Sequence, residues 1–123
     1  MLCPKNELLS FHFESSPLKG DEKKLAMKQL RERLSSLQLA VQQNGLPVIV
    51  LVEGWGTSGK GSRIASMIEA LDPRFFRVIS SGDATEEEKS RPFACRHLHN
   101  IPENGKFLFL DSGWMDETVR ELQ

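Results

Sequence analysis

Residues 48–62 read VIVLVEGWGTSGKGS, and this stretch decides the fold of the 123-residue chain. Its first five residues form a β-branched apolar run that is too short for a helix and lacks polar alternation. Such a run is typical of a strand that is buried on both faces of a parallel sheet. Glycines and hydroxyl residues follow at once, and Ile64, Ile68 and Leu71 then recur at helical spacing. The stretch therefore predicts a strand, a tight loop and a helix in direct succession.

The loop in this unit satisfies the pattern G-x-x-x-x-G-K through Gly54, Gly59 and Lys60. A strand before the pattern and a helix after it are the context expected of a phosphate-binding loop. Small residues let successive backbone N–H groups turn towards phosphate oxygens, and the lysine and the helix N-terminus add positive charge. A glycine-rich turn with an incidental lysine is the alternative. The predicted phosphate-binding residues are Gly54, Gly56, Thr57, Ser58, Gly59, Lys60, Gly61 and Ser62.

The residue after Lys60 departs from the general motif, which has Ser or Thr there to bind Mg²⁺. This chain has Gly61 at that place and the hydroxyl one position later, at Ser62. A shift of one residue turns a helical side chain by about 100°. Ser62 is therefore either a Mg²⁺ ligand in an altered geometry or an ordinary residue of the first helical turn.

A second candidate element is the run FLFLD, in which Asp111 follows four apolar residues. An aspartate at the end of a buried strand near a phosphate loop binds or orients Mg²⁺, which bridges phosphate oxygens and offsets charge during phosphoryl transfer. An ordinary turn residue is the alternative. Together with the loop, the pattern favours a Mg²⁺ role for Asp111.

Helical and strand patterns alternate through the rest of the chain. An apolar stripe predicts a helix over about 22–43, with Asp21 as its N-cap and Asn44-Gly45 as its C-terminal stop. The order of elements predicts an α/β fold, a three-layer parallel sheet with right-handed crossovers. The apolar stripe of the first helix consists of Ala26, Leu30, Leu34, Leu37 and Val41. The further predicted elements are strands at 75–80 and 106–111, a helix start at Thr85, a break at Pro92 and a last helix from Met115.

Composition limits the classes of protein that the chain can belong to. A net charge of −1 with 39% hydrophobic and 27% charged residues is ordinary for a globular domain and disfavours collagen, extended disorder and nucleic-acid coating. No apolar run is long enough for a membrane span, and residues 1–20 form an irregular arm without the features of a signal peptide. We expect a cytoplasmic domain over 21–123 with no nucleic-acid or membrane partner. We also expect Cys3 and Cys95 to be reduced thiols without a metal or disulfide role.

Four segments follow one another along the chain: GWGTSGKGS, LDPRFFRV, TEEEKSRPF and FLFLDSGWM. Together they resemble the family-2 polyphosphate kinases, most closely the first half of tandem-domain members, and the resemblance runs from about residue 22 to the last residue. It implies a P-loop kinase fold related to thymidylate kinase, Mg²⁺-dependent phosphoryl transfer, and polyphosphate and an adenine or guanine nucleotide as partners. The second and third segments disfavour a different small-molecule P-loop kinase.

Two positions depart from the pattern of the family. Its members usually have Asp in the loop where this chain has Gly56, and Asp-Arg-Ser-Trp-Tyr where this chain has residues 111–115, DSGWM, so that Ser112 replaces an arginine. Losing such an electrostatic partner commonly costs on the order of 10²-fold in rate. A non-catalytic, phosphate-binding or oligomerising half of a tandem kinase is therefore the alternative function.

Arg96 matches the arginine of a family Trp-Arg segment, although Cys95 stands in place of the tryptophan. The resemblance thus implies three catalytic residues: Lys60, Asp111 and Arg96. For Arg96 an anion clamp and a solvated helix face remain open. Weaker anion-binding candidates are Arg74, Arg77 and Lys89. We expect Trp55 and Trp114 to pack beside the loop. We expect His97 and His99 to lie on the surface.

The chain supplies three strands where kinases of this type usually have five. The resemblance implies the strand order 2-3-1-4-5, in which the loop-bearing strand would lose its neighbour and expose an apolar edge. Exposed edges invite pairing with another chain. We therefore expect a partial domain without the lid and last strands, weak or inactive alone, that forms a homo-oligomer or pairs with a second kinase domain.

Overall fold

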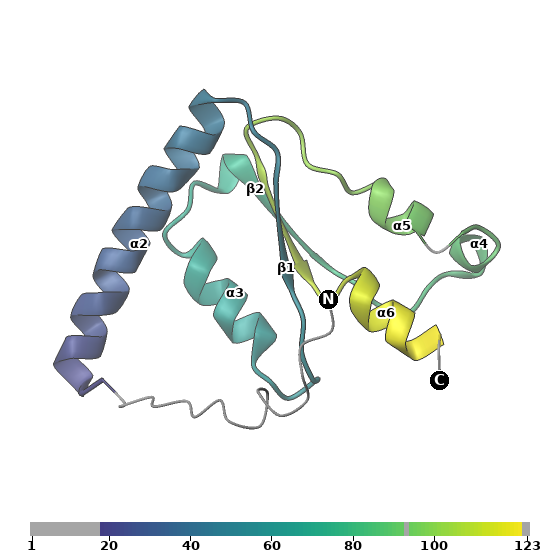
Figure 1. The fold of residues 1–123 in the computed structure, drawn as a ribbon, viewed down its shortest axis with the longest axis horizontal. Helices are drawn as coiled ribbons and strands as arrows, with labels where there is room; N and C mark the ends of the chain where they lie inside the picture. The colour runs from purple at the N-terminus through teal and green to yellow at the C-terminus, as the bar shows by residue number, and fades with distance from the viewer. Residues whose placement is uncertain (1–17, 93, 122–123) are drawn as a thin grey trace, which may run out of the picture.

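The computed structural model describes residues 18–92 and 94–121 of the chain. The irregular arm predicted for residues 1–20 therefore lies almost entirely outside the described residues. The described part is an α/β arrangement in which a small sheet separates two groups of helices (Figure 1). None of the helices in residues 18–92 and 94–121 is long and apolar enough to cross a membrane.

The sheet has three parallel strands in the order β1-β3-β2. The strands are β1 (Val48–Val52), β2 (Phe76–Ser80) and β3 (Phe107–Asp111). Within the described residues β1, which leads into the loop, is an edge strand, and the side chain of Ile49 is 41% exposed. The three predicted strands and the edge position of the loop-bearing strand are confirmed.

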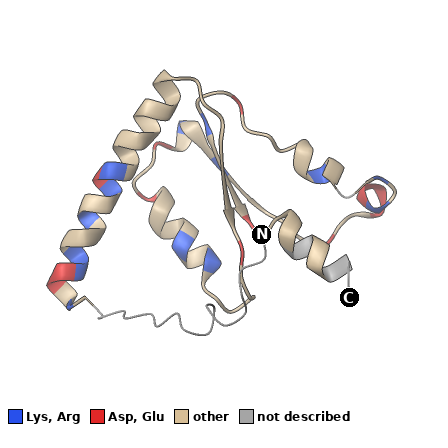
Figure 2. Ribbon diagram, in the orientation of Figure 1, with Lys and Arg blue, Asp and Glu red and all other residues tan. Residues whose placement is uncertain are grey.

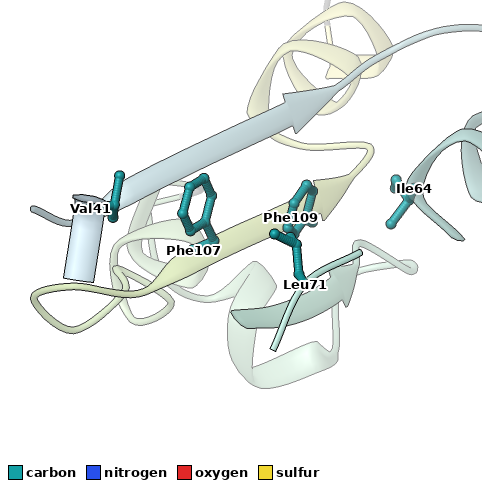
Figure 3. Close-up of a cluster of buried hydrophobic side chains, with 5 residues drawn as sticks. All are labelled: Val41, Ile64, Leu71, Phe107 and Phe109. Atoms are coloured by element: carbon teal, nitrogen blue, oxygen red, sulfur yellow. The ribbon is translucent and has the colours of Figure 1, made fainter. Parts of the chain in front are cut away.

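The main hydrophobic cluster lies between the sheet and the helices α2 (Gly20–Gln43) and α3 (Lys60–Ile68). The central strand supplies two of its rings, which stack with centroids 6.2 Å apart. Phe76 of β2 meets Phe109 edge to face, also at 6.2 Å. Figure 3 shows the five buried members, which are Val41, Ile64, Leu71, Phe107 and Phe109.

The bounds of α2 differ from those predicted at one end. The helix begins at Gly20 with Lys19 as its N-cap, so the prediction of Asp21 as N-cap is wrong, and Asp21 lies in the first turn. Acidic residues are favourable there because of the helix dipole. The predicted stop is confirmed: Asn44 is the C-cap, and Gly45 has a left-handed φ of +61°.

The inward face of α2 agrees only in part with the predicted apolar stripe. Val41 is buried and Leu34 packs against the core cluster, as predicted, but Leu30 and Leu37 are 59% and 53% exposed. The buried position beside them belongs to Gln38, whose amide accepts the Asp72 N–H at 2.8 Å and donates to the Asp72 carbonyl at 3.1 Å. A buried polar side chain is retained when it is hydrogen-bonded in this way. The helix is therefore rotated relative to its most apolar face.

The remaining elements connect the strands. Thr85 caps α4 through reciprocal bonds with Glu88, which confirms the predicted helix start. The chain breaks at Pro92 before a new helix begins, also as predicted. The helices α4, α5 and α6 lie across the sheet from α2 and α3 (Figure 1). The connecting elements are the 3₁₀ turn Pro73–Phe75, α4 (Glu86–Lys89) and α5 (Ala94–Leu98), and α6 (Trp114–Glu121) follows the last strand.

Candidate functional site

The loop between β1 and α3 adopts, at two positions, a backbone conformation that favours glycine. Gly54 has φ +152°, and a Cβ there would lie 2.9 Å from the Ser58 Oγ. Gly59 has φ +79° and is the N-cap residue of α3. The Ser58 N–H donates to the Trp55 carbonyl at 2.9 Å, which closes a turn inside the loop. The loop is therefore a tight strand-to-helix connection, as the motif predicts.

Lys60 returns to the beginning of this loop. Its Nζ donates to the Gly54 carbonyl at 2.6 Å and to the Trp55 carbonyl at 3.2 Å. Lys60 is also the first residue of α3, whose first-turn N–H groups have no partners within the helix. Figure 2 shows Lys and Arg on the first turns of α3. The loop thus joins an ammonium group, a helix N-terminus and turned backbone amides, a combination that favours an anion.

Two glycines of the loop have open space around them. A Cβ at Gly56 or at Gly61 would meet no atom within 4 Å. Neither residue has a positive φ. A Cβ therefore fits at both positions, so the backbone at Gly56 does not itself exclude the aspartate of the family pattern.

Asp111 ends the central strand at the same edge of the sheet as the loop. It pairs with Val52 of β1 on one side and with Ser80 of β2 on the other. The Ser112 N–H donates to the Val52 carbonyl at 3.0 Å, so the chain stays beside β1 after the strand ends. The structure therefore brings the two sequence-predicted elements, loop and strand-end aspartate, to one edge.

Glu53 is a residue of this edge that the sequence analysis did not select. Its Oε1 accepts the N–H of Gly113 at 3.0 Å. Gly113 is buried, and a Cβ on it would lie 2.4 Å from Leu51 Cδ1. The available sequence signal is an acidic residue directly before the first glycine of the loop, but its partner is 60 residues away.

A cavity of about 480 Å³ opens beside the loop. Trp55, one of its lining residues, is 87% exposed, so the prediction that it packs beside the loop is wrong. Trp114 does not line this cavity and instead meets the His97 ring edge to face at 5.9 Å. The full lining consists of Glu53, Gly54, Trp55, Gly56, Lys60, Ser112, Met115 and Val119.

Arg96 lies on α5 and donates to the Gly82 carbonyl, in the segment after β2, at 2.9 Å. The side chain is half-buried and is not part of the cavity lining beside the loop. The Thr85 N–H holds the pKa of the Glu88 carboxyl below its ordinary value, and the charge of Arg96 lowers that pKa further. Arg96 thus fixes the segment after β2, and its catalytic role stays a prediction.

The weaker anion-binding candidates lie apart from the loop. Lys89 pairs with Glu86 at 2.7 Å, and Arg74 pairs with Asp72 at 2.7 Å. Arg74 and Arg77 line a separate cavity of about 390 Å³, which also touches Phe76 and Phe107, the first residues of their strands. Parallel strands begin at one edge and end at the other, so these cations lie at the edge opposite the loop.

The donors at the loop edge fit a hard divalent cation. Mg²⁺ is usually held by one or two carboxylates together with substrate phosphates. Asp111 is the carboxylate at the end of the central strand, and Glu53, whose Oε1 already accepts the Gly113 N–H, is a second carboxylate at this edge. The part of the chain that the structure describes contains no group of three or more His, Cys, Asp or Glu side chains able to hold a metal ion.

Comparisons with known proteins agree with this geometry. The family model for polyphosphate kinase 2 matches residues 17–121. An NDP-polyphosphate phosphotransferase of Ruegeria pomeroyi is 30% identical over 118 residues, which is 95% of this chain and 39% of that protein. An ADP-polyphosphate phosphotransferase of Rhizobium meliloti is 32% identical, over 72% of this chain and 31% of that protein. The chain thus spans about two fifths or less of the length of these relatives.

Two solved structures have the same arrangement. A chain from Pseudomonas aeruginosa PA01 assigned to polyphosphate kinase 2 superposes with a TM-score of 0.83 at 25% identity, over 99% of this chain and 28% of that one. Polyphosphate kinase 2 from Arthrobacter aurescens TC1 gives a TM-score of 0.77 at 24% identity, over 89% of this chain and 42% of that one. The second likeness supports the fold alone.

Proposed function

The chain belongs to the polyphosphate kinase 2 family, and from this premise we propose that it binds phosphate in a cytoplasmic, Mg²⁺-dependent transfer of phosphoryl groups between polyphosphate and a nucleoside mono- or diphosphate. The observation that carries the proposal is the loop itself. Lys60 closes on the Gly54 carbonyl at one end of the sheet, and Asp111 ends the adjacent strand at that same end. The nearness of the lysine-bearing loop to a strand-end carboxylate supports a phosphoryl-binding site at this end of the sheet.

Binding is the task of residues 54–62 in this proposal. The N–H groups of the loop and of the first turn of α3 donate to phosphate oxygens, and Lys60 adds a cation that must leave the loop carbonyls to do so. Phosphoryl transfer requires little covalent chemistry from the protein, so its catalysis rests on positioning and electrostatic stabilisation. The residues that supply both here are Lys60 and Asp111, with Arg96 as the predicted third.

Asp111 is the residue that would hold Mg²⁺. The cation, when bound, bridges phosphate oxygens and neutralises charge that develops during transfer. Asp111 fits this role because it ends the central strand and pairs with Val52, two residues before Gly54 at the start of the loop. Ser62, on the first turn of α3, stays the second candidate ligand.

A nucleotide is the proposed second substrate. Relatives of this chain are named for AMP, ADP, GDP and NDP, which supports an adenine or guanine nucleotide. The 480 Å³ cavity beside Lys60 has an apolar wall that includes Trp55, Met115 and Val119. That wall is suited to the apolar face of a base, with the phosphates directed at the loop.

A second candidate function is a non-catalytic half that binds phosphate and pairs with another kinase domain or with a second copy. Two observations favour it. Gly56 and Ser112 lack the polar groups that the family pattern places near the reacting phosphates. Among the described residues β1 pairs only with β3, which leaves its other edge open to a partner strand.

One assay separates these functions. The chain is incubated with polyphosphate, Mg²⁺ and AMP, ADP or GDP, while polyphosphate affinity is measured in parallel. Nucleotide gain supports the kinase, and binding without product supports the pairing half. Lys60→Ala should abolish binding, whereas Lys106→Ala, which removes a cation at the opposite edge, should not. Equal binding by Lys60→Ala and the unaltered chain would contradict both functions.

A further inference from the structure

The turn that follows Asp111 is held against β1 by two successive hydrogen bonds. The Ser112 N–H donates to the Val52 carbonyl at 3.0 Å, and the Gly113 N–H donates to Glu53 Oε1 at 3.0 Å. The first bond joins two backbone groups, and any residue types can form it. The second depends on the side chain of Glu53. It is therefore a contact that this particular residue adds to the pairing of the two strands.

The backbone of this turn is unusual and tightly packed. Ser112 has a left-handed φ of +61°, the single positive φ among the described residues other than glycine. Gly113 has no room for a side chain, because a Cβ would lie 2.4 Å from Leu51 Cδ1 and 3.3 Å from Glu53 Oε1. Side chains rarely adopt such a backbone unless their surroundings impose it. Here the surroundings are β1 and the Glu53 carboxylate.

Glu53 connects this turn to the phosphate loop because it is the residue between β1 and Gly54. Glu53, Lys60 and Ser112 all line the 480 Å³ cavity. A hydrogen bond from an N–H to an ionised carboxylate is stronger than one between neutral groups. The bond therefore links the residue at the loop entrance to the turn that follows Asp111.

We infer that Glu53 is a positioning residue that couples the phosphate-binding loop to Asp111. By holding Gly113, it fixes the end of the central strand at Asp111 relative to the loop. Glu53 acts through the turn and does not itself contact the reacting atoms. The inference rests on the proposed function for the identity of these two ligands, but the coupling of loop and turn is a property of the fold.

The test uses tripolyphosphate and Mn²⁺ as probes on the whole chain. Replacing a residue that orients a metal ligand commonly weakens metal binding 10- to 100-fold, so Glu53→Ala should lower the gain in tripolyphosphate affinity caused by Mn²⁺ by about tenfold. Affinity without metal should change little. Glu53→Gln keeps an oxygen acceptor for Gly113 and should restore most of the gain. Glu103→Gln, at the opposite edge, is the matched control.

A second measurement tests the hydrogen bond between Glu53 and Gly113 directly. In amide NMR spectra, the Gly113 and Asp111 signals should move in Glu53→Ala and stay near their original positions in Glu53→Gln. Unmoved signals in Glu53→Ala would overturn the inference, as would an equal loss of affinity with and without Mn²⁺ that Glu53→Gln fails to restore. If the unaltered chain binds no tripolyphosphate, the proposed function fails, and the amide signals alone decide the role of Glu53.

Discussion

Lys60 Nζ donates to the carbonyl of Gly54 at 2.6 Å, so the last residue of the G-x-x-x-x-G-K motif closes on the first. The bond brings the ammonium group to the beginning of the loop and leaves the helix N-terminus beside it. An anion that enters the loop competes with the Gly54 and Trp55 carbonyls for the same ammonium. The loop is therefore organised around a positive charge, and changes to its backbone should act on anion binding first.

Gly54→Ala should weaken tripolyphosphate binding at least about tenfold, because the new Cβ meets Ser58 Oγ at 2.9 Å and the backbone has φ +152°. Gly56→Ala is the matched control, since its Cβ would meet no atom within 4 Å. Titration calorimetry measures the tripolyphosphate affinity of both variants. Equal affinities in the two variants would show that the loop backbone does not shape the anion site.

Gly56→Asp should increase the dependence of tripolyphosphate binding on Mg²⁺. The position has open space for a Cβ, and the new carboxylate would stand where the family pattern has one. An additional carboxylate should strengthen Mg²⁺ binding, because Mg²⁺ prefers oxygen donors. Gly56→Asn separates the effect of charge from that of size. Weaker binding in Mg²⁺ for Gly56→Asp than for Gly56→Asn would contradict a cation at this edge.

Trp55 should report on ligand binding by its fluorescence, because it is 87% exposed and lines the cavity beside Lys60. The second tryptophan of the chain, Trp114, packs against His97 instead. Tripolyphosphate should change the emission of Trp114→Phe as it changes that of the unaltered chain, and the change should vanish in Trp55→Phe. A response that persists in Trp55→Phe would place the ligand elsewhere.

Gln38→Leu should lower the free energy of unfolding by about 1–3 kcal/mol, although it replaces a polar residue by an apolar one in the core. The variant leaves both the N–H and the carbonyl of Asp72 without their partner. Leu37→Gln, at an exposed position of the same helix, should change the stability by less than about 0.5 kcal/mol. Urea unfolding compares them, and a more stable Gln38→Leu would contradict the role of this pair.

The cap of α4 should weaken in acid. The Thr85 N–H holds the pKa of Glu88 below its ordinary value, so the folded chain binds this proton less readily than the unfolded chain. The stabilisation is complete above the ordinary pKa of glutamate and is lost as the pH falls through the lowered value. The rate of amide hydrogen exchange at Thr85, measured over this pH range, reports the loss of the cap. Glu88→Gln should remove the dependence on pH, and an unchanged profile in that variant would exclude Glu88 as its source.

Local patterns were sufficient to predict most elements. The apolar runs at β1 and β3, the glycines of the loop and the Thr85 cap are short-range features, and the structure confirms the element that each predicted. The alternation of elements predicted the parallel sheet, and the family resemblance implied the strand order with β1 at an edge; both are confirmed within the described residues. The roles of the predicted phosphate-binding and catalytic residues stay predictions, although the structure brings the loop and Asp111 to one edge.

The predictions that were wrong concern contacts or boundaries that local patterns left open. Asp21 has a side chain that is preferred at an N-cap, but the helix begins one residue before it, and Lys19 caps it without a side-chain hydrogen bond. Leu30 and Leu37 of the predicted stripe are exposed, while the buried position belongs to Gln38, which bonds Asp72, 34 residues further along. Trp55 was expected to pack, but the loop presents it to solvent.

The sequence by itself determined the strand, loop and helix around Lys60, because apolar runs, glycines and caps act over a few residues and express the backbone preferences of those residues. Only the tertiary structure decided which face of α2 is buried and that Glu53 holds Gly113. Both depend on hydrogen bonds between segments that are distant in the sequence. Such bonds have no local signature, because their geometry exists only once the strands are paired and the helices are packed.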